Sequence, residues 1–280
     1  MTRTENKQVR RNELIGNQIH VETIGEGEPA LLFVHGFCCD STDWSGLVER
    51  LSDRFRCITV DLPGHGRSAS TAATMAAAGA AVNEAKARSG SDKVIVIGHS
   101  LGTKVIREAH RQSPDGVVGM ILVDGSLYVS DRQTMLDNAN AAVSVGMEAF
   151  LRGLFARMFD ADSPPAELDR LTRRALDRDL DFARALFLDS VNWDSIYARR
   201  TIEALSVPAL VIQATTFDSH FRWQLLPPGE TTSLIETMRS IVPDFDAVVV
   251  PNAGHFVMHD APDVTAETIA TFASRMTEKA

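Results

Sequence analysis

The 280-residue sequence predicts an α/β protein with a mostly parallel central sheet flanked by helices and a helical cap insertion. Three observations predict this fold class. Short apolar runs alternate with longer amphipathic segments, which is the pattern of strands joined by crossover helices. The run at residues 94–97, Val-Ile-Val-Ile, has no polar face, as is typical of a central strand buried on both sides. The alternation stops between Tyr128 and Arg200, where the spacing of apolar residues is helical.

The expected strands are short, apolar and rich in β-branched residues. They lie at residues 18–24, 30–35, 56–61, 93–98, 117–124, 209–213 and 247–250. Helices are expected between them at residues 43–51, 71–89, 101–112, 231–241 and 262–276. The alanine-rich stretch at residues 68–87 is interpreted as a surface helix, because alanine is the best helix former.

The insertion divides the predicted fold into two parts. Residues 1–127 and 201–280 form the α/β core, and residues 128–200 form a helical cap, in which Pro164-Pro165 opens one helix. Open α/β sheets place their sites at the carboxyl ends of the strands, so the cap is expected to cover such a site. Phe150 and Trp193 are candidates for its apolar lining.

Composition and charge exclude several classes of function. The chain is 44% hydrophobic and 23% charged, which is ordinary for a globular protein and excludes disorder. A net charge of -9 without a basic stripe argues against nucleic acid as a partner. No apolar run approaches the roughly 20 residues that span a bilayer, and residues 1–16 lack the apolar core of a signal peptide. Cys38, Cys39 and Cys57 show no metal spacing and fit reduced thiols, so we expect a cytoplasmic protein; no oligomeric state is predicted.

The strongest chemical signal is Gly-His-Ser-Leu-Gly at residues 98–102, between an expected strand and an expected helix. A turn this sharp holds Ser100 in strained backbone and tolerates only small residues two positions before and after it. The Ser100 hydroxyl then lies at a helix N-terminus, where developing negative charge is favoured. Ser100 is therefore the predicted nucleophile.

A serine needs a base, and the base needs an acid that holds its tautomer. His255 follows the last expected strand directly and is the predicted base. Two acids remain open: Asp218, on the loop after the strand at residues 209–213, and Asp124, which ends the strand before the cap. The chain order Ser, Asp, His and the strand context favour Asp218. Asp124 is alternatively interpreted as a turn cap.

Two backbone N–H groups are the expected oxyanion donors. One belongs to Leu101, directly after the nucleophile, and the other to Phe37, in the turn His35-Gly36-Phe37 after an early strand. His35, His65 and His99 belong to turn motifs and are interpreted as structural hydrogen-bonding residues. His255 and His259 lie four residues apart, but no accompanying glutamate completes a zinc motif, so neither a metal nor a cofactor is predicted.

Taken in order, these motifs resemble those of the α/β-hydrolase superfamily, in its serine-nucleophile, esterase- or lactonase-like branch with a helical cap. The motifs are His-Gly-Phe at 35–37, Asp-Leu-Pro-Gly-His-Gly-Arg-Ser at 61–68, Gly-His-Ser-Leu-Gly at 98–102 and Ala-Gly-His-Phe at 253–256. The resemblance covers the chain from Gly16 onward. It implies Ser100 as nucleophile, His255 as base, Asp218 as acid, and Phe37 and Leu101 as the oxyanion hole. Thr103 departs from the pattern, since many relatives have glycine there.

We therefore expect a serine hydrolase that cleaves a small or medium apolar carboxylic ester or lactone through an acyl-enzyme, without a cofactor. Alternatives with the same triad are a C–C bond hydrolase, a perhydrolase or a lyase. An alternative of another class is a ligand-binding receptor on a hydrolase scaffold. The fold does not choose among these activities.

Overall fold

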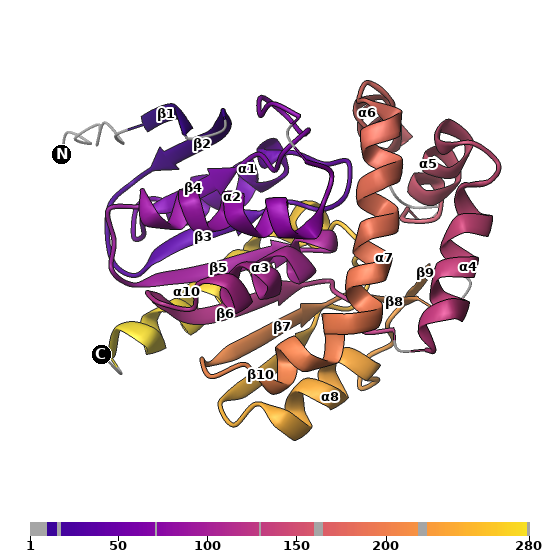
Figure 1. Cartoon of the computed structure of the whole chain (residues 1–280). Helices are drawn as coiled ribbons and strands as arrows, with labels where there is room; N and C mark the ends of the chain where they lie inside the picture. Colours follow the sequence, from indigo (N-terminus) through magenta and orange to yellow (C-terminus); the bar gives the residue numbers. More distant parts are fainter. Residues whose placement is uncertain are drawn as a thin grey trace.

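The computed structural model of the chain describes residues 10–15, 18–70, 72–128, 130–159, 165–217 and 223–278. Within them, the main sheet has the strand order β1-β2-β4-β3-β5-β6-β7-β10, and every pairing from β4 to β10 is parallel (Figure 1). The strands are β1 Arg10–Ile15, β2 Ile19–Ile24, β3 Ala30–Val34, β4 Cys57–Val60, β5 Val94–His99, β6 Val117–Val123, β7 Ala209–Gln213 and β10 Phe245–Val249. The predicted α/β fold with a mostly parallel sheet is confirmed.

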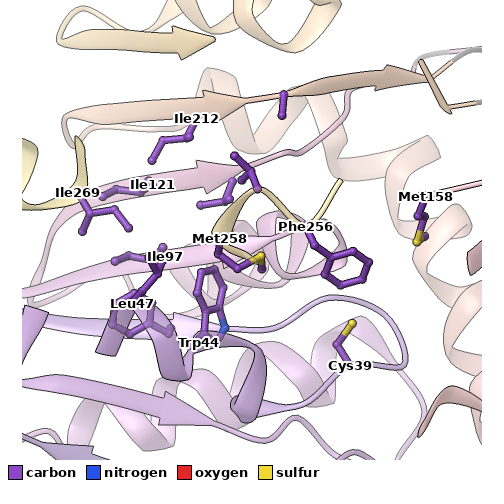
Figure 2. Packing of buried hydrophobic residues seen from close by; sticks show 14 of the residues in the cluster. Cys39, Trp44, Leu47, Ile97, Ile121, Met158, Ile212, Phe256, Met258 and Ile269 are labelled. Carbon is purple, nitrogen blue, oxygen red and sulfur yellow. The ribbon is translucent and has the colours of Figure 1, made fainter. Parts of the chain in front are cut away.

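Helices cover both faces of this sheet. They are α1 Ser45–Leu51, preceded by the 3₁₀ turn η1 Ser41–Trp44, and α2 Met75–Ala87, α3 Leu101–Gln112, α8 Ser233–Ile241, α9 Val257–Asp260 and α10 Pro262–Glu278. Side chains of each strand alternate between two apolar clusters because successive residues point to opposite faces. In β3, Leu31 and Phe33 join the cluster under α1 and α10, whereas Leu32 joins the cluster under α2 and α3. Figure 2 shows the first cluster, with Ile97 of β5 on the same side as Leu47 of α1.

Between β6 and β7 the described residues form four helices: α4 Arg132–Val143, α5 Met147–Ala156, α6 Pro165–Leu176 and α7 Leu180–Glu203. Figure 1 shows α4, α5 and α6 grouped beyond one end of the sheet, with α7 running between them and the core. The helix that contains Arg200 continues to Glu203. Its C-terminal half packs on α3, where Arg107 donates to the carbonyl of Ala198 and the Trp193 indole donates to Glu108.

Four short elements were not predicted. β1 is an edge strand whose first five residues are exposed, so it carries no apolar pattern for sequence reasoning to detect. β8 Thr215–Phe217 and β9 Trp223–Leu225 form a separate two-stranded sheet of three residues each. α9 is a single turn after His255. All four are too short or too exposed to show a period of their own.

None of the helices within the described residues combines the length and the apolar character that a membrane span requires. The three cysteines are free and buried. Burial raises the pKa of the Cys38 and Cys57 thiols to about 12, so these groups stay protonated and unreactive.

Candidate active site

Ser100 stands at the turn between β5 and α3 in a strained conformation. Its φ of 52° and ψ of −115° lie outside the regions that most L-residues adopt. Both flanking glycines are required by close backbone approach. A Cβ on Gly98 would lie 2.3 Å from the carbonyl oxygen of Gly102, and one on Gly102 would lie 2.3 Å from the carbonyl oxygen of Val34. The turn therefore has the geometry expected of a nucleophile elbow.

Thr103, the departure from the family pattern, stabilises the first turn of α3. Its backbone N–H and its hydroxyl both donate to the carbonyl of Ser100, at 3.0 and 2.7 Å. The bulk of Thr103 is accommodated by Gly125, where an added Cβ would lie 3.0 Å from the threonine methyl group. The larger residue at position 103 is thus matched by a glycine after β6.

His255 forms its side-chain hydrogen bond with Asp124. The distance from His255 Nδ1 to Asp124 Oδ2 is 2.7 Å, and both side chains are buried. A carboxylate only accepts, so Nδ1 carries the proton and the lone pair of Nε2 is left available to accept one. This is the tautomer that a histidine needs to act as a base toward a serine hydroxyl.

Asp124 is held by donors from the chain that follows β7. Oδ1 accepts from the N–H groups of Ala214 and Thr215, at 2.7 and 2.8 Å, and from the Gln213 amide at 3.1 Å. Oδ2 accepts from the Thr215 hydroxyl as well as from His255. Each of these partners is a donor, so both carboxylate oxygens act as acceptors. The residue stands at φ 43°, which aspartate tolerates better than most residues.

The first-choice acid, Asp218, lies outside the described residues. The geometry of the described residues instead favours Asp124, the alternative that chain order and strand context together had placed second. Chain order could not decide between them, because both aspartates lie between Ser100 and His255 in sequence.

The two expected oxyanion donors belong to residues next to the close contacts of the elbow. Leu101 is the first residue of α3, so its N–H has no acceptor within the helix. Phe37 directly follows Gly36, where an added Cβ would lie 3.3 Å from Ser100 Cβ. Within the described residues no hydrogen bond joins Ser100 to His255. Such catalytic bonds commonly tighten only when a substrate binds.

The histidines of the turn motifs are hydrogen-bonded in the neutral state. His35 donates from Nδ1 to the Gly36 carbonyl and accepts at Nε2 from the N–H of Leu62. His99 donates from Nε2 to the carbonyl of His255 at 2.8 Å, which ties the elbow to the base loop. Burial lowers the pKa of His35, His65 and His99, so these rings stay uncharged at neutral pH. The structural interpretation of these residues agrees with this geometry.

His259 has a different environment from His255, although only four residues separate them. His259 Nδ1 lies 3.0 Å from Glu167 of α6, and its Nε2 donates to the backbone carbonyl of Asp43. The two imidazoles therefore contact different carboxylates, Asp124 and Glu167. Among the residues that the structure describes, no group of three or more His, Cys, Asp or Glu side chains is arranged to hold a metal ion.

Aromatic rings surround the candidate site. Trp223 of β9 packs on the His255 imidazole, with ring centroids 3.9 Å apart. Phe37 contacts Phe187 of α7, which in turn contacts Phe150 of α5, at centroid distances of 6.0 and 4.7 Å. Phe150 is thus connected through Phe187 to Phe37, next to the candidate site, where the apolar lining was expected. Trp193, the other residue named for that lining, packs instead on α3.

Sequence reasoning missed Gln213, Thr215 and Trp223. The first two stand at the end of β7 and directly after it, at the edge of the sheet where side chains meet a site. A buried glutamine ending an otherwise apolar strand was the available signal. Trp223 had none, because its strand has only three residues.

The chain is similar to proteins of one family. A model of the alpha/beta hydrolase family matches residues 31–268. The 2-(acetamidomethylene)succinate hydrolase of Mesorhizobium japonicum is 27% identical over 285 residues, covering 91% of each chain. A solved structure of E-2-(acetamidomethylene)succinate hydrolase matches with a TM-score of 0.65 and 26% identity, covering 95% of this chain and 98% of that one. A pimeloyl-[acyl-carrier protein] methyl ester esterase of Nitrosomonas europaea is 40% identical over 105 residues, which cover 38% of this chain and 40% of that protein.

Three findings support the same family. They are the order of the strands, the strained serine between two glycines that leave no room for a Cβ, and the family match over residues 31–268. The chain belongs to the alpha/beta hydrolase family.

Proposed function

We propose that this protein is a serine hydrolase that cleaves a carboxylic ester or lactone with an apolar acyl group through an acyl-enzyme. The observation that carries the proposal is the His255–Asp124 hydrogen bond beside a strained Ser100. It leaves His255 in the tautomer whose free nitrogen accepts a proton. Membership of a family of hydrolases supports the reaction class.

The proposed reaction has two halves. Ser100 Oγ attacks the carbonyl carbon while His255 Nε2 takes the hydroxyl proton, and the carbonyl oxygen becomes an oxyanion facing the N–H groups of Phe37 and Leu101. The bond to the leaving alkoxide then breaks, and His255 returns the proton to it. Water repeats the sequence on the acyl-enzyme and releases the acid. The Asp124 carboxylate orients His255 and stabilises the imidazolium in both halves.

The apolar acyl group is inferred from the aromatic rings beside the oxyanion loop. Phe37, Phe150 and Phe187 form a continuous series of ring contacts from that loop into α5 and α7. Such a surface favours an alkyl or aryl chain, because burial of apolar area releases about 25 cal/mol per Å². We propose accordingly that residues 128–200 act as a cap that sets the substrate range.

The test is covalent labelling with an alkyl fluorophosphonate, followed by peptide mapping. An activated serine attacks phosphorus at a useful rate, and an ordinary one does not. We expect one labelled residue, Ser100, and no labelling of Ser100→Ala. Labelling that persists in Ser100→Ala would reject Ser100 as the nucleophile.

Turnover of p-nitrophenyl esters and lactones then separates an enzyme from a receptor. Steady-state release of nitrophenol beyond one equivalent supports the hydrolase, whereas a single stoichiometric burst would support ligand capture without turnover. A second candidate function is hydrolysis of 2-(acetamidomethylene)succinate, favoured by the 27% identity over 91% of both chains. That compound belongs in the same panel as a direct assay.

A further inference from the structure

A buried arginine from the cap segment bonds to the loop that carries one of the proposed oxyanion donors. Arg178 lies between α6 and α7, and its side chain is only 9% exposed. Its Nε donates to the carbonyl of Cys38 at 3.3 Å, and its Nη2 donates to the carbonyl of Cys39 at 2.8 Å. Nη2 also lies 3.4 Å from Asp40 Oδ2, so all three of these contacts of the guanidinium are with the loop at residues 38–40.

The two carbonyls belong to a backbone that needs such support. Cys38 has a φ of 55°, a left-handed conformation that is unfavourable for a non-glycine residue. Cys38 and Cys39 are almost fully buried, so their carbonyls are out of reach of bulk water. A buried carbonyl without a donor is costly, and Arg178 supplies the donor.

From Arg178 the hydrogen bonds continue to the oxyanion donor through two peptide groups. The Cys38 carbonyl shares its peptide group with the N–H of Cys39, and that N–H donates to the carbonyl of Gly36 at 3.2 Å. The Gly36 carbonyl in turn shares its peptide group with the N–H of Phe37. Because each peptide group is planar, fixing its carbonyl fixes the direction of its N–H.

We propose that Arg178 is a positioning residue for the oxyanion hole. Its charge polarises the Cys38–Cys39 peptide and, through it, the Gly36–Phe37 peptide, which strengthens the Phe37 N–H as a donor. Arg178 touches neither the substrate nor Ser100. The inference rests on the proposed serine-hydrolase function and extends it by making the cap segment contribute to transition-state stabilisation.

The experiment compares wild type with Arg178→Lys and Arg178→Ala, with Arg173→Ala as the matched control. Arg173 lies in the same segment, but its side chain is 81% exposed and forms an ion pair with Asp169 on its own helix. The readouts are the second-order rate of fluorophosphonate labelling at Ser100 and, for p-nitrophenyl butyrate, kcat and KM separately. A boronic acid inhibitor reports binding of a tetrahedral adduct, and butyrate reports binding of the product.

Loss of one oxyanion donor costs about 10²- to 10³-fold in kcat, so loss of its support should cost roughly 10- to 100-fold. We expect that loss in Arg178→Ala for labelling, for kcat and for boronic acid affinity, with KM and butyrate affinity within about threefold. Arg178→Lys should fall between wild type and Arg178→Ala, since an ammonium cannot reproduce the two-carbonyl geometry. Added guanidinium ion should partly restore Arg178→Ala, and Arg173→Ala should match wild type.

Equal labelling rates for wild type, Arg178→Lys and Arg178→Ala would overturn the inference while leaving the serine hydrolase intact. If Arg178→Ala fails to fold, the comparison of Arg178→Lys with wild type still decides, and equality of their labelling and kcat would reject the role. A parallel rise in KM and in the dissociation constant of butyrate, with unchanged kcat, would also reject the positioning role of Arg178, because that pattern reports a loss of ground-state binding. A wild-type protein that is not labelled at Ser100 would instead reject the proposed function itself.

Discussion

At the scale of single residues, the position of the acid depends on contacts that the sequence does not display. Sequence reasoning selected Ser100 and His255 as candidates because each belongs to a short motif with its own backbone requirement. The acid has no such motif. Asp124 is distinguished only by the donors that surround it, and these come from residues about ninety positions later in the chain. An interpretation of Asp124 as a turn cap fitted the local sequence equally well.

Replacement of Asp124 by asparagine should abolish most of the activity. Its partners are all donors, so an amide NH₂ would face N–H and O–H groups, and His255 would be held in the wrong tautomer. We expect kcat to fall by roughly 10³- to 10⁴-fold, as in the comparable serine-protease substitution. Ester turnover and circular dichroism measure the two effects, activity and fold. Asp218→Asn is the control, expected to stay within a small factor of wild type. The reverse result would return the acid to position 218.

Replacement of Thr215 by valine tests what its side-chain hydroxyl contributes. Thr215→Val keeps the shape and the backbone N–H but removes the donor to Asp124 Oδ2. A hydrogen bond to a charged group contributes about 1.5–3 kcal/mol, so kcat should fall by roughly 10- to 100-fold. Thr216→Val on the same strand is the control and should retain wild-type rates in ester turnover. A Thr215→Val enzyme with unchanged kcat would show that the backbone donors suffice.

At the scale of elements, the long and strongly patterned ones were the most predictable. The expected helix at residues 101–112 coincides with α3, because a glycine turn starts it and Ser113 ends it. The strands of the parallel sheet were located within one or two residues. The β8–β9 pair was not, since three-residue strands leave no alternation to count. That pair nevertheless places Trp223 on the catalytic candidate His255.

Phe187 of α7 is the cap residue whose size should set acyl-chain preference. It contacts Phe37 on one side and Phe150 on the other, so Phe187→Ala would enlarge the space beside the oxyanion loop. We expect the ratio of kcat/KM for p-nitrophenyl octanoate to that for the acetate to rise about threefold or more. Trp193→Phe, on the face of α7 that packs on α3, should leave the ratio unchanged. If Phe187→Ala folds and the ratio does not move, the ring serves packing only.

At the scale of the whole molecule, buried histidines should make stability depend on pH. Burial lowers the pKa of His35, His65 and His99, so they are neutral in the folded chain and take up protons more readily when unfolded. Their contribution is therefore present above the unfolded pKa near 6.5 and is lost as pH falls below it. Each such histidine can lower the free energy of unfolding by up to about 1.4 kcal/mol per pH unit.

The midpoint of urea-induced unfolding, measured at pH 8, 6 and 5, tests this dependence of stability on pH. We expect little change above pH 7 and a progressive fall below pH 6.5. Burial raises the pKa of Asp40, but Arg174 and Thr42 lower it overall, and the hydrogen bond from Arg170 lowers the pKa of Glu167 against a smaller effect of burial. The contribution of these two carboxylates to the free energy of unfolding is lost only below about pH 4.5. They therefore do not account for a fall near pH 6. A midpoint that stays constant from pH 8 to pH 5 would contradict the assignment of neutral, buried rings.

The path of α7 has a consequence for how substrate can enter. At 1.5 Å per residue its 24 residues span about 36 Å, and it is anchored to the core along this length. Asp189 caps the start of α2, and Arg107 bonds to Ala198. Lifting α7 would break both of these bonds and the Lys104–Asp194 ion pair together. By contrast, α4 and α5 rest on apolar contacts and the exposed Arg132–Asn192 pair. We therefore expect any opening of the segment between β6 and β7 to move α4 and α5, while α7 stays attached to α2 and α3.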